Sequence, residues 1–107
     1  MPFGDGGRAL YFSGHYDVVP VQDRSQLEPV VRKRNLHGRG ACDMKGGIAL
    51  MLAGLRVFEE SGPELGYDVL INSDEETGSL SSARLIAEMA QGKLAALTYE
   101  PALPNGN

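Results

Sequence analysis

Three short apolar runs alternate along this chain with two stretches of helical periodicity, and this order constrains the fold more than any other feature. The runs cover residues 9–13, 67–72 and 94–99, and each is better suited to a buried strand than to a helix. Between them, residues 44–60 and 82–89 repeat apolar side chains every three to four positions. Buried strands that alternate with helices are typical of a parallel sheet covered by helices. We therefore expect an α/β fold, with a largely parallel sheet and flanking helices.

Smaller signals refine this prediction. Residues 29–31 indicate a short edge strand or hairpin arm, and the basic residues 32–34 indicate a solvated strand or turn. Gly92 follows the second helical stretch and is suited to end it. In the first helical stretch, Leu50 and Val57 widen the apolar stripe, so we expect most of that helix to be buried.

Composition excludes several function classes. The formal net charge is −4 and the basic residues are scattered, so we expect no nucleic-acid partner. No apolar run approaches the ~20 residues of a membrane-spanning helix, so we expect no membrane partner. Residues 1–7 lack the basic and apolar regions of a signal peptide, but this says little about location. The location stays unknown, and we expect the cytoplasm rather than secretion. Cys42 is the only cysteine, and we interpret it as a small buried side chain.

A histidine and several acidic residues follow directly after the predicted strands. His15 ends the first strand, Glu75 and Glu76 follow the second, and Glu100 follows the third. The carboxyl ends of parallel strands lie at one edge of a sheet, where ligands of such folds bind. Several carboxylates gathered there would repel one another unless a cation lay between them. The sequence therefore predicts a metal site at this edge.

The spacing of these residues indicates individual roles. Asp17 lies two positions after His15 in an extended segment, so it can hold the second ring nitrogen of that histidine. Asp43 precedes the first helix, where its carboxylate could bridge two ions or serve as a simple N-cap. Glu75 and Glu76 are adjacent at a strand exit, and we expect them to project in opposite directions. One would then ligate the metal, and the other would take a proton from a bound water.

Two metal ions that share a bridging aspartate need a further ligand, most naturally a histidine. The candidate for that position is His37, six residues before Asp43. Its neighbours are basic residues and glycine, so we interpret it as an exposed loop histidine rather than a ligand.

Four motifs occur in order along nearly the whole chain: SGHYDVVP at 13–20, GRGACDMKGG at 38–47, DEETGS at 74–79 and EP at 100–101. Together they resemble the zinc metallopeptidase family of glutamate carboxypeptidase, acetylornithine deacetylase and succinyl-diaminopimelate desuccinylase. The resemblance implies that residues 1–107 are part of the catalytic domain of a di-zinc exopeptidase-like fold.

The resemblance also implies a role for each site residue. Asp17 would orient the histidine ligand, Glu75 would be the general base, and the Asp43–Met44 peptide bond would be cis. The metal ligands would be His15 and Glu100 on one zinc ion, Asp43 on both ions and Glu76 on the other. Cobalt or manganese would also suit this set of ligands.

The implied activity is hydrolysis of an amide bond in a small peptide or an N-acyl amino acid. Residues 78–86 and 99–101 look closer to the glutamate carboxypeptidase branch, and an N-acyl amino acid deacylase of the same family is the alternative. Family members carry the second zinc's histidine well beyond the equivalent of Glu100. They also carry a smaller capping domain that often dimerises.

We therefore expect a longer full-length protein that can form a homodimer, and little activity from this chain alone. An inactive fragment is accordingly one alternative function. A nucleotide-binding module is another, but residues 38–43 give only half of the glycine-rich fingerprint, and the acid at position 43 would repel a pyrophosphate.

Overall fold

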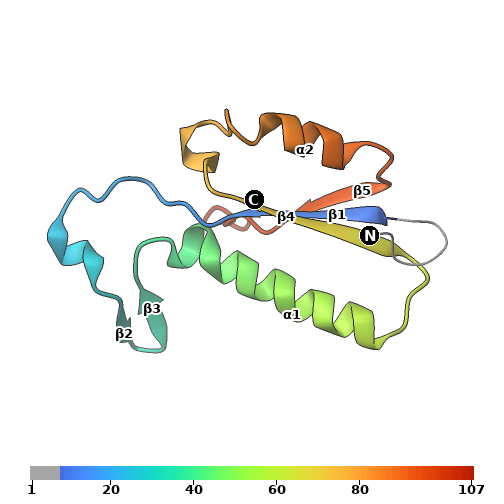
Figure 1. The fold of residues 1–107 in the computed structure, drawn as a ribbon. Coiled ribbons are helices and arrows are strands. Elements are labelled where there is room, and N and C mark those ends of the chain that lie inside the picture. Colours follow the sequence, from blue (N-terminus) through green and yellow to red (C-terminus); the bar gives the residue numbers. More distant parts are fainter. Residues whose placement is uncertain (1–7) are drawn as a thin grey trace.

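The computed structural model describes residues 8–107, and its centre is a three-stranded parallel sheet (Figure 1). The prediction about a signal peptide and location falls on residues 1–7, outside the described part. The middle strand pairs in parallel with both of its neighbours, in the order β4-β1-β5. The strands are β1 (Arg8–His15), β4 (Gly66–Asn72) and β5 (Ala95–Thr98).

Two helices lie on opposite faces of this sheet (Figure 1), α1 (Gly46–Glu60) and α2 (Ala83–Ala90). This arrangement confirms the predicted α/β fold, with a parallel sheet and flanking helices. Neither of these helices is long and apolar enough to cross a membrane, and the same holds for every helix within residues 8–107.

Between β1 and α1 the chain makes an excursion away from the sheet (Figure 1). It contains the 3₁₀ turn η1 (Arg24–Leu27) and an antiparallel hairpin of β2 (Val30–Arg32) and β3 (Asn35–His37). Lys33 and Arg34 form the exposed turn between these strands, each with a positive φ. The predicted hairpin arm and solvated basic turn are both confirmed.

The register of the sheet brings the ends of its strands together. His15 of β1 lies opposite Asn72 of β4, and Ser13 lies opposite Thr98 of β5. Because the strands are parallel, the segments that follow them leave from the same edge of the sheet. That edge holds the acidic segments singled out from the sequence.

The core lies between the sheet and α1. Phe12 of β1 packs with Met51 and Leu55 of the helix, and all three are buried. The rings of Phe12 and Tyr67 meet edge to face, with centroids 5.7 Å apart. This packing fixes α1 against β1, and so fixes the turn that precedes α1 near the end of that strand.

Three burial predictions were wrong. Leu50 and Val57 are 67% and 66% exposed, because α1 buries only the stripe that faces the sheet. The four residues of β5 are all exposed, although the strand was predicted to be buried. Cys42 is exposed as well, because it lies in the turn before α1 rather than in the packed part of the helix.

Candidate metal centre

His15 lies at the centre of the site. This residue is the last of β1, and its side chain is 2% exposed. The ring nitrogen Nε2 lies 3.1 Å from Oδ1 of Asp43, 3.3 Å from Oε1 of Glu100 and 3.6 Å from Oε2 of Glu75. Three segments that are far apart in the sequence therefore place a carboxylate against one imidazole nitrogen.

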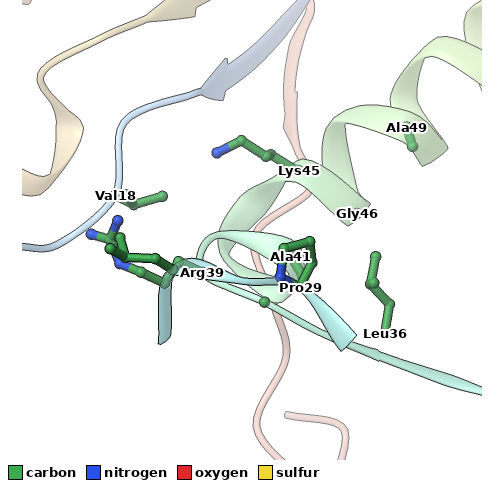
Figure 2. A pocket seen from close by; sticks show the side chains of 10 residues that line it. Val18, Pro29, Leu36, Arg39, Ala41, Lys45, Gly46 and Ala49 are labelled. Atoms are coloured by element: carbon green, nitrogen blue, oxygen red, sulfur yellow. The ribbon is translucent and has the colours of Figure 1, made fainter. Parts of the chain in front are cut away.

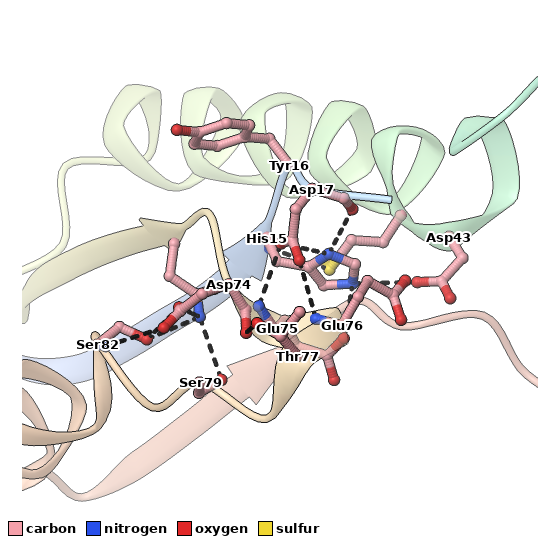
Figure 3. A network of polar contacts seen from close by, with 12 residues as sticks. His15, Tyr16, Asp17, Asp43, Asp74, Glu75, Glu76, Thr77, Ser79 and Ser82 are labelled. Atoms are coloured by element: carbon pink, nitrogen blue, oxygen red, sulfur yellow. Dashed lines mark hydrogen bonds and ion pairs between the residues drawn. The ribbon is translucent and has the colours of Figure 1, made fainter. Parts of the chain in front are cut away.

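Asp17 holds the other side of the ring (Figure 3). The nitrogen Nδ1 of His15 lies 3.0 Å from the backbone carbonyl oxygen of Asp17 and 3.3 Å from its Oδ1. The Asp17 carboxylate also accepts hydrogen bonds from the backbone N–H groups of Glu75 and Glu76, at 3.2 and 2.8 Å. Burial alone would raise the pKa of Asp17, but backbone N–H groups, these two first among them, together with the nearby His15 outweigh it and lower the pKa. Asp17 thus joins the histidine to the acidic turn, as a group that orients both.

A turn of π-helical type, η2 (Ala41–Lys45), positions Asp43. Asp43 and Met44 have non-helical backbone angles, and the peptide bond between them is cis, as the resemblance implied. The N-cap of α1 is Lys45, without a side-chain cap hydrogen bond, so the alternative reading of Asp43 as that N-cap is wrong. The Asp43 carboxylate instead faces the buried histidine.

Glu75 and Glu76 lie in the 3₁₀ turn η3 (Glu75–Thr77), which follows β4. The prediction that they project in opposite directions was wrong. One oxygen of each carboxylate lies within 4.8 Å of the other and of a His15 ring nitrogen. The prediction assumed extended backbone, in which neighbours alternate, whereas a helical turn places neighbours closer to the same side.

Two residues that were given no role from the sequence support this centre. Met44 is fully buried, and its sulfur accepts a hydrogen bond from the backbone N–H of His15 at 3.3 Å. Asp74 accepts several hydrogen bonds within the loop that carries the two glutamates. The signal for Asp74 was present in the sequence, because an aspartate before a short turn followed by serines is a typical acceptor for turn N–H groups.

Glu100 reaches the site because β5 and α1 approach each other closely. At Gly47, a Cβ atom would lie 1.9 Å from the carbonyl oxygen of Tyr99, the residue before Glu100. Only glycine leaves room for this contact, since real Cβ atoms essentially never come under 3.0 Å. Gly47 therefore sets how near Glu100 can come to the histidine.

Gly47→Ala should destabilise the chain by about 1–3 kcal/mol, because the new methyl group overpacks the contact with the Tyr99 backbone. Urea-induced unfolding measures this change. Gly54→Ala is a matched control in the same helix, where the nearest atom to the new Cβ is a tyrosine hydroxyl at 3.9 Å. That control should be stabilised by about 0.5–1 kcal/mol through helix propensity. Equal stability of the two variants would contradict the argument.

Burial and neighbouring charges both shift the pKa values of the site. Burial lowers the pKa of His15, but the Asp17 carbonyl and the carboxylates of Glu100, Asp43 and Glu75 outweigh it, so that the pKa is raised. Burial raises the pKa of Glu76, and the charges of Asp43 and Glu75 raise it further. Burial is also the main cause of the raised pKa of Glu100. A bound cation would favour the ionised carboxylates and relieve this repulsion.

The ligand atoms fall into two groups that share the histidine. One consists of His15, Asp43 and Glu100, and the other of His15, Glu75 and Glu76; within each group the atoms lie within 4.8 Å of one another. Imidazole nitrogen and carboxylate oxygen are donors that zinc accepts, and cobalt and manganese accept them too. The residues therefore fit a metal ion. His37 belongs to neither group, since it lies exposed on β3.

A pocket of about 540 Å³ is lined by residues of the hairpin segment, of η2 and of the start of α1 (Figure 2). Its two cationic side chains are engaged with the segment that follows β1. Lys45 Nζ donates to the Tyr16 carbonyl oxygen at 3.2 Å, and the Arg39 guanidinium donates to the Val19 carbonyl oxygen. These two contacts hold the segment that contains Asp17.

The fold and the site define an α/β protein with a buried histidine and five acidic side chains at one sheet edge, an arrangement suited to metal-dependent hydrolysis. The sequence model of peptidase family M20/M25/M40 matches residues 11–107, and the chain belongs to that family. The family is typically metal-dependent, so the predicted classes of hydrolase and metallopeptidase are supported.

Proposed function

We propose that this chain supplies metal ligands and the general base of a hydrolase that cleaves amide bonds in small peptides or N-acyl amino acids. The observation that carries the proposal is the environment of His15. Its Nδ1 is held by Asp17, and its Nε2 faces the carboxylates of Asp43, Glu100 and Glu75. A buried imidazole with one nitrogen fixed and the other directed at acidic ligands is typical of a metal-binding histidine.

Two zinc ions are the proposed cofactors, with cobalt or manganese as substitutes. His15, Asp43 and Glu100 would hold one ion, while Asp43 and Glu76 would hold the other. Zinc bound there would act as a Lewis acid for the substrate carbonyl and would lower the pKa of bound water.

Glu75 is suited to transfer a proton from the attacking water to the leaving amine. Its carboxylate is 45% exposed, whereas the adjacent His15 side chain is 2% exposed, so Glu75 can meet substrate and water at the edge of the site. The carboxylate would accept a proton from the attacking water and return it to the leaving amine nitrogen. The hydrogen bond from its backbone N–H to Asp17 keeps it beside the metal ligands.

Glu75→Gln should lower kcat by about 10²–10⁴-fold, because the amide cannot accept the proton. The assay is hydrolysis of an acyl-glutamate with zinc, in a polypeptide that extends this chain through a further histidine-containing segment. Glu64→Gln is the control, since this exposed glutamate precedes β4 at the opposite end of that strand. Full activity of the Glu75 variant would contradict the proposed mechanism.

The chain alone should hydrolyse little. Within the part that the structure describes, the site receives one histidine, and a second zinc ion would need another. The comparison is between the 107-residue chain with zinc and the extended polypeptide. Robust turnover by the shorter chain would show that the ligands on it are sufficient.

For the substrate, we propose the glutamate carboxypeptidase type, on the likeness of residues 78–86 and 99–101 to that branch. The alternative is a deacylase of N-acyl amino acids. Rates of the extended polypeptide on an acyl-glutamate and on an acetylated basic amino acid separate these two. Faster hydrolysis of the second substrate would favour the deacylase.

A further inference from the structure

The carboxylate of Asp74 accepts four hydrogen bonds within one loop (Figure 3). Oδ2 accepts from the backbone N–H groups of Ser81 and Ser82, at 2.8 and 3.1 Å. Oδ1 accepts from the hydroxyl of Ser82 at 2.6 Å and from the side-chain amide of Asn72 at 3.1 Å. The carboxylate thus joins the end of β4 to the start of α2, across the loop that carries the two glutamates of the site.

The backbone of Asp74 closes the same loop from within. Its carbonyl oxygen accepts from the N–H and the hydroxyl of Thr77, at 3.3 and 3.0 Å, and from the N–H of Ser79 at 2.8 Å. Ser79 has φ of +57°, a left-handed conformation that a serine adopts rarely. Contacts to Asp74 on both sides hold the loop in this shape.

Two aspartates therefore fix the segment of Glu75 and Glu76. Asp17 binds its backbone N–H groups from the side of His15, and Asp74 binds the remainder of the loop from the side of α2. Asp74 belongs to neither group of ligand atoms, and both of its oxygens are engaged within the loop. Its effect on the site must act through the position of the glutamates.

We propose that Asp74 is a positioning residue, which keeps the carboxylates of Glu75 and Glu76 within reach of His15 and of a metal ion bound there. This inference rests on the proposed function, because it takes the two glutamates as part of the metal site. Loss of the Asp74 acceptor would free both ends of the loop and spread the two carboxylates over several positions.

The test is a titration of the 107-residue chain with Co²⁺, followed by its visible absorption. In Asp74→Asn, one carboxylate oxygen becomes an amide nitrogen, which donates and cannot accept, so the side chain can no longer accept from the donors on both of its sides. We expect Co²⁺ binding to weaken by about 10–100-fold, as for other residues that support metal ligands, and the spectrum at saturation to change. Asp23→Asn is the matched control, because Asp23 also accepts a backbone N–H before a 3₁₀ turn, from Ser25 at 2.9 Å in η1.

Equal Co²⁺ affinity and equal spectra for the Asp74 and Asp23 variants would overturn the inference. Failure of the unsubstituted chain to bind Co²⁺ would overturn the proposed metal site itself, and this outcome is distinct because it needs no variant.

If circular dichroism shows that Asp74→Asn does not fold, Ser82→Ala replaces it, since this change removes the hydroxyl donor and keeps the carboxylate. That variant should bind Co²⁺ several-fold more weakly, and unchanged affinity would overturn the inference.

Discussion

His15→Gln should weaken Co²⁺ binding by the 107-residue chain by about 100-fold or more, the largest effect on metal affinity that we expect from a single substitution. This histidine is the only member common to both groups of ligand atoms. Residues that merely support metal ligands typically contribute about 10–100-fold in affinity, so the loss of a ligand itself should exceed that range. Isothermal titration or the visible absorption of Co²⁺ measures the change.

His37→Gln is the matched control for this experiment. It makes the same chemical change in the other histidine of the chain, which lies exposed on β3 and outside both groups of ligand atoms. Its Co²⁺ affinity should equal that of the unsubstituted chain. If both variants lost affinity equally, or if neither did, the assignment of His15 as the central ligand would be wrong.

The sequence was sufficient to predict which residues meet at the site. Parallel strands end at one edge, so residues that follow separate strands, such as His15 and Glu100, had to lie near one another. Spacing within one segment was equally informative for Asp17, whose two-residue separation from His15 places it against the ring. The first argument depends on parallel pairing of the strands, which the structure shows.

The sequence was insufficient where local backbone depends on distant partners. The directions of Glu75 and Glu76 are set by a 3₁₀ turn, and their backbone N–H groups bind Asp17, almost sixty positions earlier. The helix predicted over residues 44–60 likewise begins later, at Gly46, and Met44 has a non-helical conformation in the turn before it. Such turns cannot be read from a window of neighbouring residues.

Periodicity also failed to predict which apolar side chains are buried. The pattern of α1 treats Leu50 and Met51 as members of one wide apolar stripe, yet Leu50 is 67% exposed and Met51 is 0% exposed. Periodicity reports which residues are apolar, but burial depends on which elements pack over each face. The same limit explains why β5 was predicted to be buried and is exposed.

Met51→Ala should destabilise the chain by about 2–5 kcal/mol, because it leaves a cavity where Met51 packs with Phe12 and Leu55. Leu50→Ala, one position earlier in the same helix, should change stability by about 0.5 kcal/mol or less, since its side chain is mostly solvated. The measurement is urea-induced unfolding followed by circular dichroism, without metal. Similar losses in the two variants would mean that the helix buries a wider face than the structure shows.

Repeating the same unfolding experiment with Co²⁺ separates the core from the site. A ligand that binds only the folded state adds stability according to its concentration and affinity. Met51 belongs to neither group of ligand atoms, so Co²⁺ should raise the free energy of unfolding of Met51→Ala by the same amount as that of the unsubstituted chain. His15→Gln should lose this increment, whatever its own stability. A much smaller increment in Met51→Ala would show instead that core packing beneath β1 controls the geometry of the metal ligands.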